Sequence, residues 1–406
     1  MISRLAWVWT PTRLVLWWRR LTGCAAASSA NERHSFILFR LDALGDLVLT
    51  TPLFRELKRA WPLSRLTVVI QEPYRSLLET NPFIDNLLCV PTLRSRWVPK
   101  LALRLLAAIR FYLDHLRGHS FDVALSPRWD VDEHLATMLC ALSHAKLRVG
   151  YSERASEGKR RLNRGFDAAF DICLPPGPLQ HEVLRSIALI EALAVEVQDR
   201  TPDLHLGARD RDYADRVCTD LPRNTLLVAL GIGAQSPGRR WPLERYAEAM
   251  NALSAQFPLQ SIITGSPAEQ GDATRLAAMI GGRPIIACSP AIREACALLA
   301  RCDLYLGNDT GAAHLAAAMN VPSIVISRHP GNGDPNHPNS PQRFAPYGVL
   351  SRVLQPESGL DGCASRCTHL EPHCINAITV DHVVSAAREM LDRRQAHAGC
   401  FEEIAR

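Results

Sequence analysis

The sequence lacks an apolar run long enough to span a bilayer, since no uninterrupted stretch of about 18 apolar residues occurs in it. It also lacks the usual phosphate-binding motifs. There is no P-loop Lys-Ser/Thr, and after Gly231 and Gly233 the third glycine, Gly238, falls too late for a dinucleotide fingerprint. No motif that reads RNA or DNA is present. These absences disfavour a membrane-spanning protein, an NTPase and a hydride-transfer enzyme.

Densely spaced cysteines are missing as well. The twelve cysteines are scattered from Cys24 to Cys400, which favours reduced thiols in a cytosolic protein over a secreted disulfide scaffold. The chain is 47% hydrophobic and 21% charged, an ordinary globular composition, and its net charge of +5 suits an anionic partner without selecting nucleic acid. At 406 residues, two domains are expected.

Residues 1–34 are interpreted as a separate N-terminal appendage. Residues 1–30 contain four tryptophans and four arginines, a mixture suited to a membrane interface: Trp7, Trp9, Trp17, Trp18, Arg4, Arg13, Arg19 and Arg20. The stretch 21–24 imitates a lipoprotein cleavage box, but Pro11, Arg19 and Arg20 interrupt the apolar core that a signal peptide needs. The alternatives are an uncleaved segment that contacts a membrane, and a disordered tail or mis-assigned start.

Short apolar runs alternate with helix-like segments along the chain, which predicts α/β architecture with doubly wound parallel sheets. The expected strands are 35–39, 66–70, 87–90, 121–125, 226–230, 260–264, 284–287, 304–306 and 323–326. Residues 148–170 are polar and basic and are interpreted as loop. A linker at 194–223 marks the boundary between the expected domains, which are 35–205 and 206–380, followed by a C-terminal helix and tail at 381–406. Two such halves would face each other across a ligand-binding cleft.

The turn after residues 304–306 is a candidate ligand site. Asn308 or Asp309 can cap the helix that follows, whose free N–H groups favour an anion. Thr310 and His314 are four residues apart and share one helix face. From these residues alone, a plain helix cap and a ligand site are equally good interpretations.

Two basic stretches are candidate anion sites. Arg239 and Arg240 follow a strand and could hold a diphosphate, although a surface arginine pair is the simpler alternative. The amphipathic segment 94–119 carries several cations and could touch anionic lipid or a phosphorylated acceptor. A solvated helix face is the commoner explanation for such a segment.

Cys363, Cys367 and Cys374 lie close in sequence to His369 and His373. Their spacing is not a standard zinc pattern, so buried free thiols are preferred to a bound metal.

Four motifs occur in a fixed order along residues 35–391. They are Arg40-Leu41-Asp42-x-x-Gly45-Asp46-x-x-x-x-Thr51-Pro52, Arg239-Arg240-Trp241-Pro242, Gly265-Ser266-Pro267-Ala268-Glu269 and Asn308-Asp309-Thr310-Gly311-x-x-His314. Each motif is weak alone, but the ordered set resembles the bacterial lipopolysaccharide heptosyltransferases, glycosyltransferase family nine. The resemblance implies the GT-B fold, with two Rossmann-like domains. It also implies an inverting, metal-independent transfer of heptose from ADP-heptose to the lipopolysaccharide core.

The same resemblance implies roles for individual residues. Asp46 is similar to the family's general base, with Asp42 as the reserve candidate and a second helix cap as the bland alternative for Asp46. Arg40, Asp42 and Gly45 would form the acceptor or anion-binding side. The donor side would comprise Arg239, Arg240, Glu269, Asp309, Thr310, Gly311 and His314. The family more often has lysine where this chain has Arg239, and neither a metal nor a cofactor is expected.

The implied partners are a nucleotide-sugar donor and an anionic glycolipid acceptor, met at the cytoplasmic face of the bacterial inner membrane by peripheral contact. Nucleic acid is not expected. One alternative keeps the fold but changes the sugar, as in capsule or O-chain assembly or in a nucleotide-sugar epimerase. Another is a non-catalytic nucleotide-sugar-binding subunit of a polysaccharide assembly complex, which would have no use for a base at Asp46.

Overall fold

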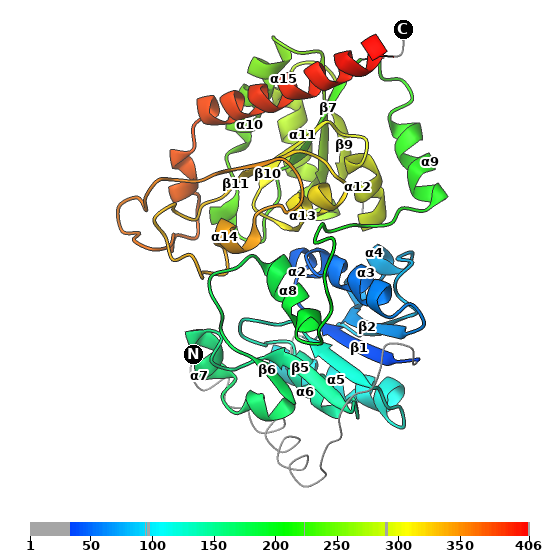
Figure 1. Ribbon diagram of the computed structural model, residues 1–406. Helices are drawn as coiled ribbons and strands as arrows, with labels where there is room; N and C mark the ends of the chain where they lie inside the picture. The colour runs from blue at the N-terminus through cyan, green and yellow to red at the C-terminus, as the bar shows by residue number, and fades with distance from the viewer. Residues whose placement is uncertain (1–32, 94, 96–97, 223, 289–290, 405–406) are drawn as a thin grey trace. The chain divides into compact units, whose positions relative to one another are not determined.

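The computed structural model describes residues 33–404 except 94, 96–97, 223 and 289–290 (Figure 1). Of the expected N-terminal appendage, only the last two residues fall within this range. The described residues form two compact units, one ending at Arg200 and the other beginning at Thr201. Each unit contains one six-stranded parallel sheet with helices on both sides.

The first unit has the strand order β3-β2-β1-β4-β5-β6. Its strands are β1 (Ser35–Arg40), β2 (Arg65–Gln71), β3 (Asn86–Val90), β4 (Val123–Ser126), β5 (Leu147–Tyr151) and β6 (Ile172–Leu174). Its helices are α2 (Leu44–Val48), α3 (Thr51–Ala60), α4 (Arg75–Leu78), α5 (Lys100–Phe111), α6 (Ala136–Leu142), α7 (Glu157–Leu162) and α8 (Glu182–Glu191).

The second unit has the strand order β12-β11-β10-β7-β8-β9. Its strands are β7 (Leu226–Gly231), β8 (Leu259–Gly265), β9 (Ile285–Cys288), β10 (Leu304–Asn308), β11 (Ser323–Ile326) and β12 (Ser351–Leu354). Its helices are α9 (Ala208–Val217), α10 (Leu243–Ser254), α11 (Gln270–Met279), α12 (Ile292–Leu299), α13 (Gly311–Ala318), α14 (Pro341–Phe344) and α15 (Val380–Ile404).

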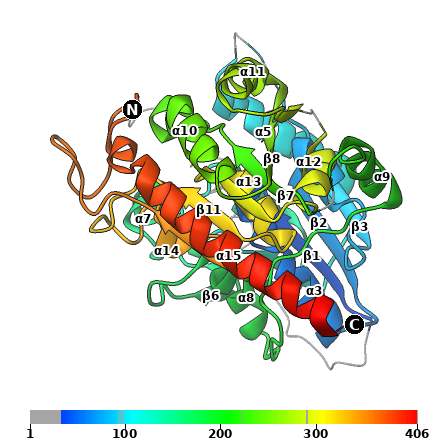
Figure 2. The ribbon, with the colours of Figure 1, turned by 90° about the horizontal axis from the view of Figure 1, so that it is seen from above.

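The central strands are apolar throughout because helices cover both faces of each sheet. In β1, Ile37 and Phe39 belong to the core that includes residues of α5 and α6, and Phe36 and Leu38, which alternate with them, are buried as well. In the second unit α15 lies along α10 in both views (Figures 1 and 2). No helix among the described residues is both long enough and apolar enough to cross a membrane.

The structure corrects the interpretation of residues 148–170 as loop. Arg148 lies inside β5 and is 2% exposed, and its guanidinium forms two hydrogen bonds of 2.7 and 2.8 Å with the Asp171 carboxylate. The bidentate pair compensates the buried charge and lets an arginine occupy an interior strand. Because a charged residue interrupts the apolar run, the apolar pattern did not predict this strand. Helix α7 also falls in the stretch that was expected to be loop.

Candidate functional site

The first candidate site lies at the carboxyl end of β1, where open parallel sheets usually bind ligands. Arg40 is the last residue of β1, and Asp46 is the third residue of the short helix α2. The Arg40 guanidinium lies 3.3 Å from the Asp42 carboxylate and 3.2 Å from the Asp46 carboxylate. Arg128, which follows the neighbouring strand β4, lies 3.3 Å from Asp42 and 3.8 Å from Asp46.

The pKa values of the two carboxylates of this site are shifted in opposite directions. Burial raises the pKa of Asp46 above its usual value, Asp42 raises it further, and the opposing effects of Arg40 and Arg128 do not cancel the rise. Burial alone would also raise the pKa of Asp42, but Arg128 and Arg40 outweigh it and lower this pKa. A pair of carboxyl groups whose pKa values are pushed apart is typical of acid–base sites. Of the two carboxylates, that of Asp46 has its pKa raised and therefore binds a proton more readily than that of Asp42.

Arg128 was missed by the sequence analysis. It lies just beyond β4, and β4 pairs with β1, so only the strand order brings it to Asp42 and Asp46. The loop that carries it is fixed by Lys159, which is buried and donates to the carbonyls of Arg128 at 2.7 Å and Tyr151 at 2.9 Å. The sequence feature that could have indicated Arg128 is its place just after the end of an expected strand.

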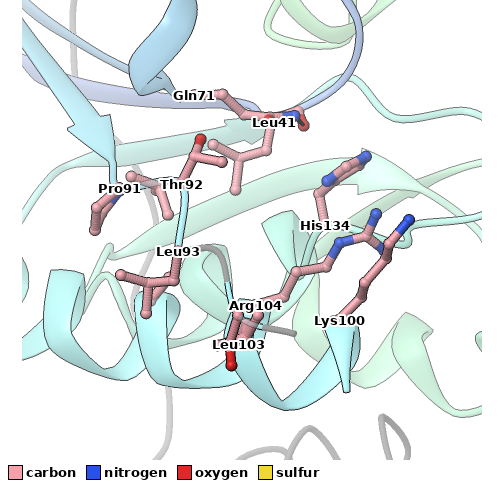
Figure 3. Close-up of a pocket in the computed structure, with 12 residues that line it drawn as sticks. Leu41, Gln71, Pro91, Thr92, Leu93, Lys100, Leu103, Arg104 and His134 are labelled. Carbon is pink, nitrogen blue, oxygen red and sulfur yellow. Dashed lines mark hydrogen bonds between the residues drawn. The ribbon is translucent and has the colours of Figure 1, made fainter. Parts of the chain in front are cut away.

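Beside this cluster the first unit has a pocket of about 330 Å³. Leu41, between the two motif residues Arg40 and Asp42, lines it, and helix α5 forms one wall. The basic side chains of Lys100, Arg104 and His134 are grouped on one side of the pocket (Figure 3). Burial and the nearby Arg104 lower the pKa of His134. The pocket therefore presents the cations of Lys100 and Arg104 near Leu41, in the loop that follows β1.

The second candidate site lies in the second unit, at the carboxyl ends of β7 and β10. Arg239 donates to the Asp309 carbonyl and lies 3.5 Å from the Asp309 carboxylate. Ser327, just after β11, donates to the same carboxylate at 3.4 Å. Burial raises the pKa of Asp309, although Arg239 works in the other direction. The structure thus brings Arg239 and Asp309 together, and it adds Ser327, which the sequence analysis did not single out.

Neither Asn308 nor Asp309 caps α13, which corrects that expectation. The N-cap residue is Thr310, and it makes no side-chain cap bond. Asn308 instead joins two loops and a helix. Its carbonyl oxygen accepts from the Trp241 backbone at 2.9 Å and from the Tyr246 hydroxyl at 3.1 Å, and its amide donates to the Ile232 carbonyl at 2.7 Å. At α3 the N-cap residue is Thr50, and Thr51, which could have capped this helix by its sequence, is the first helical residue and donates its hydroxyl to the Val48 carbonyl.

The remaining predicted donor-side residues are spread around this end of the sheet. Glu269 caps a 3-10 turn, because its carboxylate accepts from the Ser266 backbone, and it also lies over Gly233, where a Cβ atom would come within 1.5 Å of this carboxylate. Arg240 is turned towards the Ala234 carbonyl and Asp272. Thr310 and Gly311 are half-buried at the start of α13, and His314 is buried within it.

Two Rossmann-like sheets in one chain define an α/β protein of the GT-B type. The model of "glycosyltransferase family 9 (heptosyltransferase)" matches residues 114–356, which is more than half of the chain. The chain belongs to this family and is a glycosyltransferase.

Curated relatives are distant in sequence but cover most of the chain. The lipopolysaccharide core heptosyltransferase OpsX of Haemophilus influenzae is 24% identical over 79% of this chain and 84% of its own length. Lipopolysaccharide heptosyltransferase 2 of Escherichia coli is 22% identical over 77% of this chain and 85% of its own length.

Solved structures share the fold. A family 9 glycosyltransferase from Veillonella parvula aligns with a TM-score of 0.68 at 20% identity and covers 90% of this chain and 99% of its own. The E. coli heptosyltransferase WaaC with ADP aligns with a TM-score of 0.63 at 18% identity and covers 88% and 99%. The predicted GT-B fold is confirmed.

Proposed function

We propose that this protein is an inverting, metal-independent glycosyltransferase that moves heptose from ADP-heptose to a lipopolysaccharide core-type acceptor. The observation that carries the proposal is the Asp46 carboxylate in α2, just after β1, whose side chain is 12% exposed and whose pKa is raised beside the Asp42 carboxylate, whose pKa is lowered. A base of this kind accepts the proton of an acceptor hydroxyl as its oxygen attacks. Relatives named as heptosyltransferases support the sugar.

In the proposed reaction the acceptor oxygen bonds to the anomeric carbon from the side opposite the phosphate. Its O–H proton passes to Asp46, and the bond between the anomeric carbon and the phosphate oxygen breaks with its electron pair leaving on ADP. The departing diphosphate is stabilised by Arg239 and by the N-terminus of α13, with Thr310 and Gly311 nearest. Asp309 and Glu269 accept hydrogen bonds from donor hydroxyl groups, and Arg240 and His314 complete the donor side.

The acceptor side is assigned to the first unit. Arg40, Asp42 and Gly45 surround Asp46, and the pocket beside them presents Lys100 and Arg104. Cations at this place suit the carboxylates or phosphates of an anionic glycolipid. The solved WaaC structure with ADP supports a nucleotide as the other substrate.

A panel of nucleotides and nucleotide sugars tests the donor. ADP-heptose and ADP should raise the unfolding temperature, because a ligand that binds only the folded state stabilises it by about 2.7 kcal/mol at one hundred times its Kd. The corresponding UDP and GDP compounds should have little effect. A preference for UDP or GDP would exclude the ADP-heptose assignment. Product formation, followed by mass spectrometry, separates a transferase from a non-catalytic binding subunit.

We also propose that the protein contacts the cytoplasmic face of the inner membrane through α5. The helix turns Ala107, Ala108 and Phe111 into the core. On the other side Leu106, Ile109 and, in the turn after the helix, Leu113 are exposed by 53%, 45% and 51%. The basic residues of this segment within the described range are Lys100, Arg104, Arg110 and Arg117. Apolar side chains flanked by cations suit an anionic lipid surface, and α5 also lines the acceptor pocket.

Replacing Leu106, Ile109 and Leu113 together by serine should weaken co-sedimentation with phosphatidylglycerol-containing vesicles by about ten- to hundredfold, since each side chain loses burial in lipid. The matched control replaces three exposed leucines elsewhere, Leu63, Leu179 and Leu350. Equal vesicle binding by both triple variants would remove α5 from the membrane contact.

A further inference from the structure

Four potential metal ligands gather in the loop between β12 and α15, drawn in orange in Figure 1. They are Cys363, Cys367, His373 and Cys374, and their ligand atoms all lie within 4.8 Å of one another. The Nδ1 atom of His373 is 3.7 Å from the Cys363 sulfur and 3.4 Å from the Cys374 sulfur. All three cysteines are free.

The two nitrogen–sulfur distances match the edges of a tetrahedral site. With Zn–S bonds of about 2.3 Å and Zn–N bonds of about 2.0–2.1 Å, tetrahedral geometry places sulfur and nitrogen ligands about 3.6 Å apart. The sequence spacing did not fit a standard zinc pattern, because adjacent residues, His373 and Cys374, both contribute. The folded loop nevertheless presents three thiols and one imidazole, a recognised structural zinc set.

Apolar packing contributes little to the order of this loop. Of residues 357–371, all of which the structure describes, only Cys367 is buried, while Leu360 and Leu370 are exposed. A loop of this length without a packed core requires another source of order. A metal ion bound by four side chains supplies it, because binding free energy becomes folding free energy.

We propose that Cys363, Cys367, Cys374 and His373 bind one thiophilic transition-metal ion, for which this ligand set favours Zn²⁺. Four protein ligands leave no open position, so the ion is structural. A soft thiolate set of this kind does not suit Mg²⁺ or Ca²⁺.

The proposed site also supports the donor side. The carbonyls of His369 and Leu370 approach Gly238 so closely that a Cβ there would lie 2.7–2.8 Å from them, and Arg328 donates to the same His369 carbonyl at 3.1 Å. Gly238 precedes Arg239, and Arg328 follows Ser327. The loop therefore packs against the chain neighbours of both residues that contact Asp309. This consequence rests on the proposed function, whereas the metal site itself does not.

Metal content tests the site directly. The full chain is purified under reducing conditions without a polyhistidine tag or chelator. Inductively coupled plasma mass spectrometry should then find about one equivalent of zinc or iron per chain. Cys363→Ser should lose that metal, and Cys218→Ser, at a half-buried cysteine of the same unit, should keep it. Replacement by Co²⁺ should give the visible absorption of a tetrahedral thiolate site. A chain without bound metal that takes up neither Zn²⁺ nor Co²⁺, or a disulfide among these cysteines, would overturn the proposal.

A second measurement addresses the link to the donor side. Cys363→Ser should raise the KM for the nucleotide sugar more than it lowers kcat, and limited proteolysis should cut the 355–374 loop faster. Loss of metal with unchanged KM and unchanged proteolysis would leave the metal site standing and refute its supporting role.

Discussion

Asp46→Asn should lower kcat by about 10² to 10⁴-fold, the usual contribution of a positioned general base, while ADP still binds. Asparagine keeps the shape and the contact with Arg40, but it cannot accept a proton. The measurement is steady-state transfer together with ADP binding by thermal shift. Unchanged turnover would remove Asp46 from the role of base and make Asp42 the next candidate.

The pH profile separates the two carboxylates. The base must be deprotonated, so activity should fall as the pH drops through the raised pKa of Asp46. Asp42 contributes to that rise, and Asp42→Asn should therefore move the acidic limb of kcat to lower pH. If Asp42 were itself the base, Asp42→Asn would abolish transfer and Asp46→Asn would leave it largely intact.

Arg239→Ala should lower kcat by about 10² to 10³-fold, the range found when one group that stabilises developing charge is removed. Arg239 is held by the carbonyl and carboxylate of Asp309, so its charge is already placed before the donor arrives. Arg239→Lys should recover part of the rate, because the cation is kept while the planar fork is lost.

Arg240→Ala is the matched comparison for the Arg239 variant. The guanidinium of Arg240 already donates to the Ala234 carbonyl and pairs with Asp272. The loss of rate in Arg240→Ala should therefore be smaller than in Arg239→Ala. A larger effect at Arg240 than at Arg239 would reverse the assignment of the cation that meets the diphosphate.

Much of the fold follows from the apolar pattern, because the central strands are covered on both faces. Strands β1, β2 and β7 are continuous apolar runs and lie close to where they were expected. Strands β5, β6 and β12 escaped prediction. Arg148 shows the reason in β5, where a charged side chain interrupts the apolar run and is compensated by the carboxylate of Asp171.

The candidate sites were only partly accessible from the sequence. Asp46, Arg239 and Asp309 lie inside recognisable motifs. Arg128 and Ser327 lie outside these motifs, and they reach the sites because strand order brings the ends of β4 and β11 beside β1 and β10. The proximity of Cys363, Cys367 and Cys374 could not be predicted either, since the distance between thiols depends on how the loop folds and not on their spacing along the chain.

Asn308 has a consequence for how this part of the protein can vary. One side chain serves the loop after β7, the backbone of Trp241 and the hydroxyl of Tyr246. Substituting it alone would strand three buried polar groups at once. Substitutions in the donor-side loop, the start of α10 and the end of β10 are therefore coupled. Sequence variants that change position 308 should carry compensating changes at position 246.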